Sequence, residues 1–317
     1  MKHVIDVKHL VKQYNNSKER AVDDISFTVN EGEFFSLLGP NGAGKTTTIS
    51  ILTTTLSTTS GEVKIAGYDI DTQSTQIRQN IGVIFQKPSL DQNLTAEENI
   101  RLHAVLYGLY PFSPMYSMMP DSYKERVHEL AELLDISKDL FKPIKTYSGG
   151  MKRKLEIVRS LMHNPKILFL DEPTTGLDPL SRRNLWEYLV DVRKREHTTI
   201  FLTTHYLEES ENADQIAIIN HGKIVMKGTP TEVKAHLVKG YVSIDVKPKD
   251  RSAVKAELTK MKVSFVEEEH IRIPVKDGEG ARIVQSIKTP LTHLKVHTPS
   301  LEDAYLEIVE DTHAERT

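Results

Sequence analysis

The residues best suited to chemistry lie in one glycine-rich stretch. Residues 39–46 read G-P-N-G-A-G-K-T and fit the pattern G-x-x-x-x-G-K-[ST], whose backbone N–H groups wrap nucleotide phosphates. The apolar run before the stretch predicts a buried strand, and residues 47–56 predict a helix that starts at the lysine. A glycine loop followed by a helix N-terminus is an anion site. The predicted phosphate-binding residues are Gly39, Pro40, Asn41, Gly42, Ala43, Gly44, Lys45, Thr46 and Thr47.

A carboxylate pair, Asp171 and Glu172, follows the apolar run 167–170, which predicts a second buried strand. Asp171 could hold Mg²⁺ opposite the hydroxyl of Thr46. Glu172, one residue further on, could polarise a water for attack on a γ-phosphate. A solvated strand end often carries the same two residues, so the interpretation depends on the glycine-rich loop. Together the two motifs predict Mg²⁺-dependent nucleotide hydrolysis.

A second anion site is predicted where residues 147–152 read Y-S-G-G-M-K before an amphipathic run. The Ser148 hydroxyl, the N–H groups of Gly149 and Gly150 and the helix dipole would converge there. With this motif, residues 1–235 resemble the ATP-binding cassette (ABC) family. The family's usual signature is L-S-G-G-Q, from which Tyr147 and Met151 depart. The serine and glycines are intact, so the departure affects only the contacts that a glutamine amide would make.

The resemblance implies roles for four further residues. Tyr14 corresponds to the aromatic residue that stacks on adenine, and Gln86 to the glutamine that contacts Mg²⁺ and the attacking water. Asp178 lies in a loop by which opposing subunits communicate. His205 corresponds to the histidine that contacts the γ-phosphate, whereas the other 12 histidines show no ligand spacing.

The same resemblance implies catalytic, metal-binding and nucleotide-binding residues. The catalytic residues are Glu172, His205, Gln86 and Lys45. The metal-binding residues are Thr46, Gln86 and Asp171. The implied cofactors are ATP and Mg²⁺. Besides the residues of the glycine-rich loop, the residues expected to contact the nucleotide are Tyr14, Ser148, Gly149, Gly150 and Asp178.

The elements that must position these residues alternate between strands and helices, which predicts an α/β fold. Strand-like alternation over residues 4–14 and 21–29 predicts two antiparallel strands that feed the main sheet. The other expected elements are strands at 61–67, 81–86 and 199–204, helices within 95–135 and over 181–195, and a hairpin over 215–226. The resemblance implies a P-loop ABC ATPase domain, that is, a mixed sheet with a RecA-like core plus antiparallel β and helical subdomains.

Residues 110–121, within the helical region, read Y-P-F-S-P-M-Y-S-M-M-P-D. Three prolines predict a loop rather than a helix. Its aromatic and methionine side chains would suit a contact surface. A surface loop packed on itself is an equally good interpretation.

The chain divides into two predicted domains. Residues 1–235 form the ABC ATP-binding domain, with a helical subdomain at about 87–160. Residues 240–317 show a β-α-β-β-α-β order, which predicts a small α+β ferredoxin-like domain, followed by a helix over 300–309. This domain has no catalytic spacing and is expected to be a packing or regulatory appendage.

Composition limits the function classes. The 317 residues carry a net charge of −3, which gives no electrostatic reason to expect a nucleic-acid partner. The absence of cysteine excludes disulfides and thiolate zinc sites. The N-terminus lacks the apolar core of a signal peptide, and no apolar run approaches the length of a membrane span. A cytoplasmic chain is therefore expected.

Residues 147–156 and 299–305 resemble the daunorubicin- and multidrug-resistance exporter branch of the family. That resemblance implies the ATPase subunit of an exporter, peripheral on the cytoplasmic face of the membrane and bound to a separate polytopic permease. One phosphate loop and one signature imply a homodimer or a pair with a paralogous subunit. The substrate class stays open among drugs, lipids, peptides, polysaccharides and ions. The alternatives are a soluble ABC ATPase of translation or DNA repair and a binding module with a dead ATPase.

Overall fold

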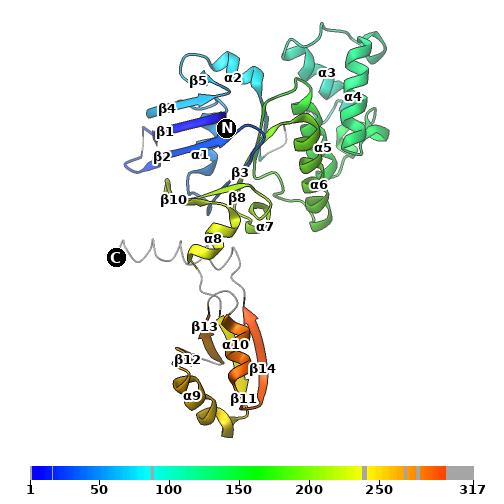
Figure 1. The fold of residues 1–317 in the computed structure, drawn as a ribbon. Helices are drawn as coiled ribbons and strands as arrows, with labels where there is room; N and C mark the ends of the chain where they lie inside the picture. Colours follow the sequence, from blue (N-terminus) through cyan, green and yellow to red (C-terminus); the bar gives the residue numbers. More distant parts are fainter. Residues whose placement is uncertain are drawn as a thin grey trace. The chain divides into compact units, whose positions relative to one another are not determined.

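The computed structural model describes residues 2–15, 17–86, 89–237, 241–267, 270–275 and 279–297. The chain divides into two compact units, Met1–Lys227 and Gly228–Thr317 (Figure 1). The predicted domain boundary between residues 235 and 240 stays a prediction. In the structure the helix α8 (Pro230–Leu237) belongs to the second unit.

The first unit contains an antiparallel sheet with the strand order β2-β1-β4-β5. Its strands are β1 (His3–Gln13), β2 (Arg20–Asn30), β4 (Ser60–Ile65) and β5 (Tyr68–Asp69). The expectation that the first two strands would feed the main sheet is wrong. β1 pairs with β2 on one side and with β4 on the other, so neither of its edges is open to the main sheet.

The main sheet of this unit has the order β10-β9-β3-β8-β7-β6. Its strands are β3 (Phe34–Leu38), β6 (Ile81–Ile84), β7 (Ile167–Asp171), β8 (Thr199–Thr204), β9 (Gln215–Asn220) and β10 (Lys223–Gly228). The strands from β9 to β6 pair in parallel, and β3, β7 and β8 are buried along their whole length. A parallel sheet buried on both faces explains why these strands read as continuous apolar runs.

The parallel order places the chemistry at one edge of the sheet. The segments that follow β3, β6, β7 and β8 carry the glycine-rich loop, Gln86, Glu172 and His205. Since the carboxyl ends of parallel strands lie at the same edge, these segments are neighbours in space. Four phenylalanines join the two sheets: Phe27 of β2 stacks on Phe35 of β3, and both lie beside Phe201, which also contacts Phe169.

Helices surround the main sheet and also form a region of their own (Figure 1). Four of the helices that directly precede or follow strands of the main sheet in the sequence are α1 (Lys45–Leu52), α2 (Ser74–Asn80), α6 (Pro179–Glu196) and α7 (Leu207–Ser210). The helical region contains α3 (Ala96–Leu106), α4 (Asp121–Leu133) and α5 (Gly149–Leu161), with short 3-10 turns η1 (Tyr116–Met118), η2 (Ser137–Asp139) and η3 (Ile144–Thr146). A capping box of Thr95 and Glu98 starts α3. No helix in the described part of the chain is long and apolar enough to cross a membrane.

The second unit has its own core around Val242, Ile244 and Leu258. Its elements are β11 (Tyr241–Val246), the turn η4 (Pro248–Asp250), α9 (Arg251–Lys260), β12 (Val266–Glu267), β13 (Ile271–Pro274), α10 (Glu279–Ser286) and β14 (Leu291–His297). The strand order is β12-β13-β11-β14. The ferredoxin-like assignment stays a prediction, and the helix expected over residues 300–309 lies outside the described residues.

Candidate active site

The glycine-rich loop connects the end of β3 to the start of α1, as the sequence predicts. A Cβ atom on Gly39 would lie 2.3 Å from the carbonyl oxygen of Ile219, and one on Gly44 would lie 2.4 Å from the carbonyl oxygen of Ala21. Only glycine fits at these two positions. The loop therefore brings backbone N–H groups to the N-terminus of α1, where partial positive charge favours an anion.

Lys45, the first residue of α1, points back across this loop. Its Nζ atom donates to the carbonyl oxygens of Gly39 at 2.8 Å and Pro40 at 3.0 Å, and it lies 3.4 Å from Oε1 of Glu172. Burial lowers the pKa of Lys45, and the nearby Glu172 carboxylate opposes that shift. The site thus holds a buried cation beside the carboxylate that we expect to be catalytic.

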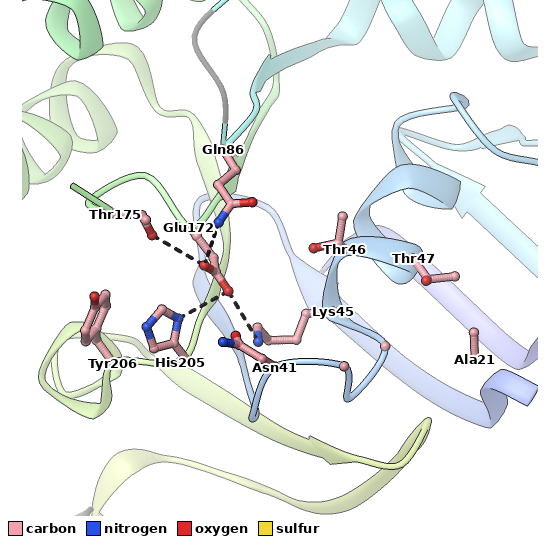
Figure 2. Close-up of a pocket in the computed structure, with 12 residues that line it drawn as sticks. Ala21, Asn41, Lys45, Thr46, Thr47, Gln86, Glu172, Thr175, His205 and Tyr206 are labelled. Atoms are coloured by element: carbon pink, nitrogen blue, oxygen red, sulfur yellow. Dashed lines mark hydrogen bonds and ion pairs between the residues drawn. The ribbon is translucent and has the colours of Figure 1, made fainter. Parts of the chain in front are cut away.

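Glu172 is the residue on which the other side chains converge (Figure 2). Its Oε2 atom accepts from Gln86 Nε2 at 3.2 Å and from Thr175 Oγ1 at 3.3 Å. Its Oε1 atom lies 3.2 Å from Nδ1 of His205, a contact that lacks hydrogen-bond alignment. The side chain is only 9% exposed, and the backbone has a φ of 45°. A non-glycine residue held in this left-handed region is typical of functional sites.

Asp171, the last residue of β7, provides oxygen donors beside the loop. Its Oδ1 atom accepts from Thr203 Oγ1 at 2.5 Å and lies 3.5 Å from the Thr46 hydroxyl. Burial raises the pKa of Asp171, and the Thr203 hydrogen bond counteracts part of that rise. One carboxylate and one hydroxyl suit Mg²⁺, which is usually bound by few protein ligands and keeps several waters. Among the described residues no cluster of three or more acidic, histidine or cysteine side chains could hold a metal.

A cavity of about 450 Å³ lies at the glycine-rich loop, and Asp171 does not line it. The predicted residues that line it are Asn41, Gly42, Gly44, Lys45, Thr46, Thr47, Gln86, Glu172 and His205. Ala21, Thr175 and Tyr206 line it as well, and sequence reasoning missed them. Tyr14 is 44% exposed and its hydroxyl lies 3.3 Å from that of Thr47, which places the ring beside the loop rather than in the cavity wall.

The signature residues do not line this cavity. Ser148 caps α5 and accepts from the N–H of Met151 at 3.2 Å. A separate cavity of about 110 Å³ includes Ser148 and Gly150 in its lining. Asp178 caps α6, where it accepts from the N–H and hydroxyl of Ser181. One chain therefore does not bring its two predicted anion sites together.

A buried ion pair between Arg153 and Glu156 supports the site from α5. Arg153 donates to the carbonyl oxygens of Pro173 at 2.7 Å, Phe85 at 2.7 Å and Gln86 at 3.3 Å, and it contacts Glu156 at 2.9 Å. The arginine thus ties α5 to the segments that carry Gln86 and Glu172. The sequence signal is weak, because an arginine and a glutamate three residues apart on a helix usually form a solvated pair.

Comparisons with known proteins agree with this geometry. A family model described as ABC transporter matches residues 22–175. The doxorubicin resistance ATP-binding protein DrrA of Mycobacterium tuberculosis (strain ATCC 25618 / H37Rv) is 35% identical over 316 residues, which covers 95% of this chain and 92% of that protein. The daunorubicin/doxorubicin resistance ATP-binding protein DrrA of Streptomyces peucetius is 41% identical over 234 residues, with 74% and 67% covered.

Solved structures with the same fold include an ATP-binding subunit of an ABC transporter. That structure is 31% identical, has a TM-score of 0.62, and is matched over 73% of this chain and 92% of its own. A second is a dimeric ATP-binding cassette in a post-hydrolysis state with ADP and Pi. It is 25% identical with a TM-score of 0.62, matched over 71% of this chain and 98% of its own. These matches confirm the predicted cassette fold.

Proposed function

This chain belongs to the ABC transporter family, and from that premise we propose that it is the ATP-hydrolysing subunit that powers a drug-resistance exporter. The observation that carries the proposal is the convergence of Lys45, Gln86 and His205 on the buried carboxylate of Glu172. Relatives named for resistance to doxorubicin and daunorubicin favour an exporter over a soluble translation or repair ATPase.

Each of these side chains has a proposed role in hydrolysis. The loop N–H groups and Lys45 would hold the β- and γ-phosphates and balance the charge that develops in the transition state. Glu172 would accept a proton from the attacking water, while Gln86 fixes the carboxylate and the water relative to each other. His205, whose Nδ1 lies 3.2 Å from Oε1 of Glu172, would contact the γ-phosphate and hold this geometry.

Thr46 and Asp171 are the residues that we expect to hold Mg²⁺, with Gln86 as a third contact. Their oxygen atoms, a hydroxyl and a carboxylate 3.5 Å apart, match the preference of this ion. When bound, Mg²⁺ would neutralise phosphate charge and orient the γ-phosphate. Thr203 fixes the carboxylate rotamer through its hydrogen bond to Asp171.

Two chains are needed to complete each ATP site. Ser148, Gly149 and Gly150 lie at the N-terminus of α5 and outside the lining of the phosphate cavity of the same chain. In a dimer these residues would contact the γ-phosphate held by the partner, so ATP would close the interface and hydrolysis would release it. The dimeric cassette of similar fold supports this arrangement. A homodimer and a pair with a paralogous subunit both satisfy it.

The partner that converts this cycle into transport is proposed to be a separate polytopic membrane permease. The chain would then sit on the cytoplasmic face of the membrane, and the permease would select the drug, lipid, peptide, polysaccharide or ion. We propose that the loop at residues 110–121 contributes to docking. Tyr116 packs on Tyr123, and Met119 is buried, so part of the loop is packed on the domain.

Three apolar side chains of this loop remain exposed: Phe112 is 72% exposed, and Met115 and Met118 are each 57% exposed. Replacing all three with serine should reduce recovery of the permease and drug export while ATP turnover of the isolated chain is retained. Val190→Ser, at an exposed valine of α6, is the matched control. Unchanged permease recovery in the triple variant would refute docking through this loop.

ATP turnover and dimerisation test the proposed mechanism directly. Glu172→Gln should lower kcat at least about 100-fold, since it removes the base that accepts the proton of the water. With MgATP the same variant should accumulate as a dimer in analytical ultracentrifugation, whereas Ser148→Arg should stay monomeric. Equal turnover by wild type and Glu172→Gln would show that Glu172 is not the base.

A further inference from the structure

Glu209 is a buried carboxylate for which the mechanism above has no role. It lies in the short helix α7 and is only 1% exposed. Among the ion pairs of the described residues none involves Glu209. Burial raises its pKa, and hydrogen bonds from Thr174 and Thr204 act in the opposite direction. A buried carboxylate without an ion-pair partner is costly, and an apolar residue would be cheaper for folding alone.

The two hydrogen-bond donors to Glu209 come from the two segments that build the active site. The Thr174 hydroxyl donates to one carboxylate oxygen, and Thr174 lies two residues after Glu172. The Thr204 hydroxyl donates to the other oxygen, and Thr204 immediately precedes His205. One side chain therefore connects the segment of Glu172 to the segment of His205.

The hydrogen bond to Glu209 also fixes the direction of the Thr204 hydroxyl. Because Thr204 donates its proton to the carboxylate, its oxygen lone pairs remain to accept from the N–H of Tyr206 at 2.9 Å. This pair of contacts holds the backbone on both sides of His205. On the other side of the segment, the N–H of Glu172 donates to the carbonyl oxygen of Thr203 at 3.0 Å. The position of the imidazole relative to Glu172 is thus set from two directions.

We propose that Glu209 is a positioning residue that holds His205 and Glu172 in register for ATP hydrolysis. The inference rests on the proposed roles of Glu172 and His205. Glu209 itself does not line the phosphate cavity, so it acts through Thr174 and Thr204. Replacement by glutamine keeps the size of the side chain but exchanges one acceptor oxygen for an NH₂ donor, so only one of the two hydroxyls can still donate to it and the other must accept instead.

The test is a thermodynamic cycle in the full chain with MgATP. Glu209→Gln should lower kcat about tenfold and leave KM for ATP within about twofold, because misplacement of a reacting geometry affects the chemical step. In a His205→Ala background the same substitution should lower kcat by a clearly smaller factor, since one of the two residues that Glu209 holds in register is absent. Glu33→Gln is the matched control. Glu33 is also buried and accepts a backbone N–H, at the opposite end of β3, and kcat should be unchanged.

A second pair of variants gives an independent answer if Glu209→Gln folds poorly or the His205→Ala background is inactive. Thr204→Val should lower kcat as Glu209→Gln does, and Thr204→Ser, which keeps the hydroxyl, should restore it. Wild-type kcat in Glu209→Gln or Thr204→Val, or an equal loss in both His205 backgrounds, would overturn the inference. Wild-type kcat in His205→Ala would instead refute the proposed role of His205 and, with it, the proposal that Glu209 acts by positioning His205.

Discussion

Arg153→Met is expected to destabilise the chain strongly, because it removes the donor for three carbonyl groups and the partner of Glu156. The side chains of Arg153 and Glu156 are 4% and 2% exposed. Removing one member of a buried ion pair costs about 3–5 kcal/mol, because the remaining charge is buried without compensation. For a unit of this size 1 kcal/mol shifts Tm by roughly 2–4 °C, so we expect a decrease of about 6–20 °C.

The matched control is Arg183→Met. Arg183 and Glu187 also lie on one helix, but their side chains are 78% and 62% exposed. Loss of this exposed pair should cost at most about 0.5 kcal/mol. Circular dichroism during heating, with urea unfolding at 25 °C, measures both variants. Glu156→Met added to Arg153→Met should recover part of the loss, since an apolar pair leaves no buried charge. Equal shifts for Arg153→Met and Arg183→Met would refute the assigned importance of burial.

Two further predictions concern a half-buried histidine and a loop glycine. Burial lowers the pKa of His103 to about 3, so between about pH 6.5 and 3 the unfolded chain binds a proton that the folded chain does not, and stability falls as the pH falls. His103→Phe should remove about 2 kcal/mol of the loss between pH 7 and pH 5 in urea unfolding, and an unchanged pH dependence would contradict this. Gly39→Ala should destabilise by about 1–3 kcal/mol and weaken ATP binding measured by calorimetry, because its Cβ would overlap a carbonyl oxygen. Gly67→Ala, which meets no atom within 4 Å, should cost only about 1 kcal/mol of backbone strain and leave ATP binding intact.

The part of the site that the sequence predicts best lies at the ends of parallel strands. The strand expected at residues 199–204 has the same bounds in the structure, and Gln86, Glu172 and His205 follow three strands of one sheet. Because buried parallel strands are continuous apolar runs, the polar residue after each run is visible in the sequence. The places of Gln86, Glu172 and His205 in the cavity lining follow from that topology.

The supporting residues could not be found in the same way. Arg153, Glu156 and Glu209 are charged residues on helices, where the sequence pattern indicates solvent exposure. Their burial depends on tertiary neighbours such as Thr174 and Pro173, which come from other elements. The sequence pattern also does not determine which strands pair with each other. Alternation predicts β1 and β2 but does not identify β4 as the second neighbour of β1.

To power transport, this ATPase must bind a membrane permease. The most direct test is purification of the tagged Glu172→Gln chain with MgATP from membranes solubilised in mild detergent, followed by quantitative mass spectrometry. The slow hydrolysis expected of this variant should preserve the closed complex. We expect a polytopic membrane protein in an amount comparable to the chain itself. Recovery from the cytosol alone, with ribosomes, with DNA or without any partner, would contradict the transport function and leave only the ATPase.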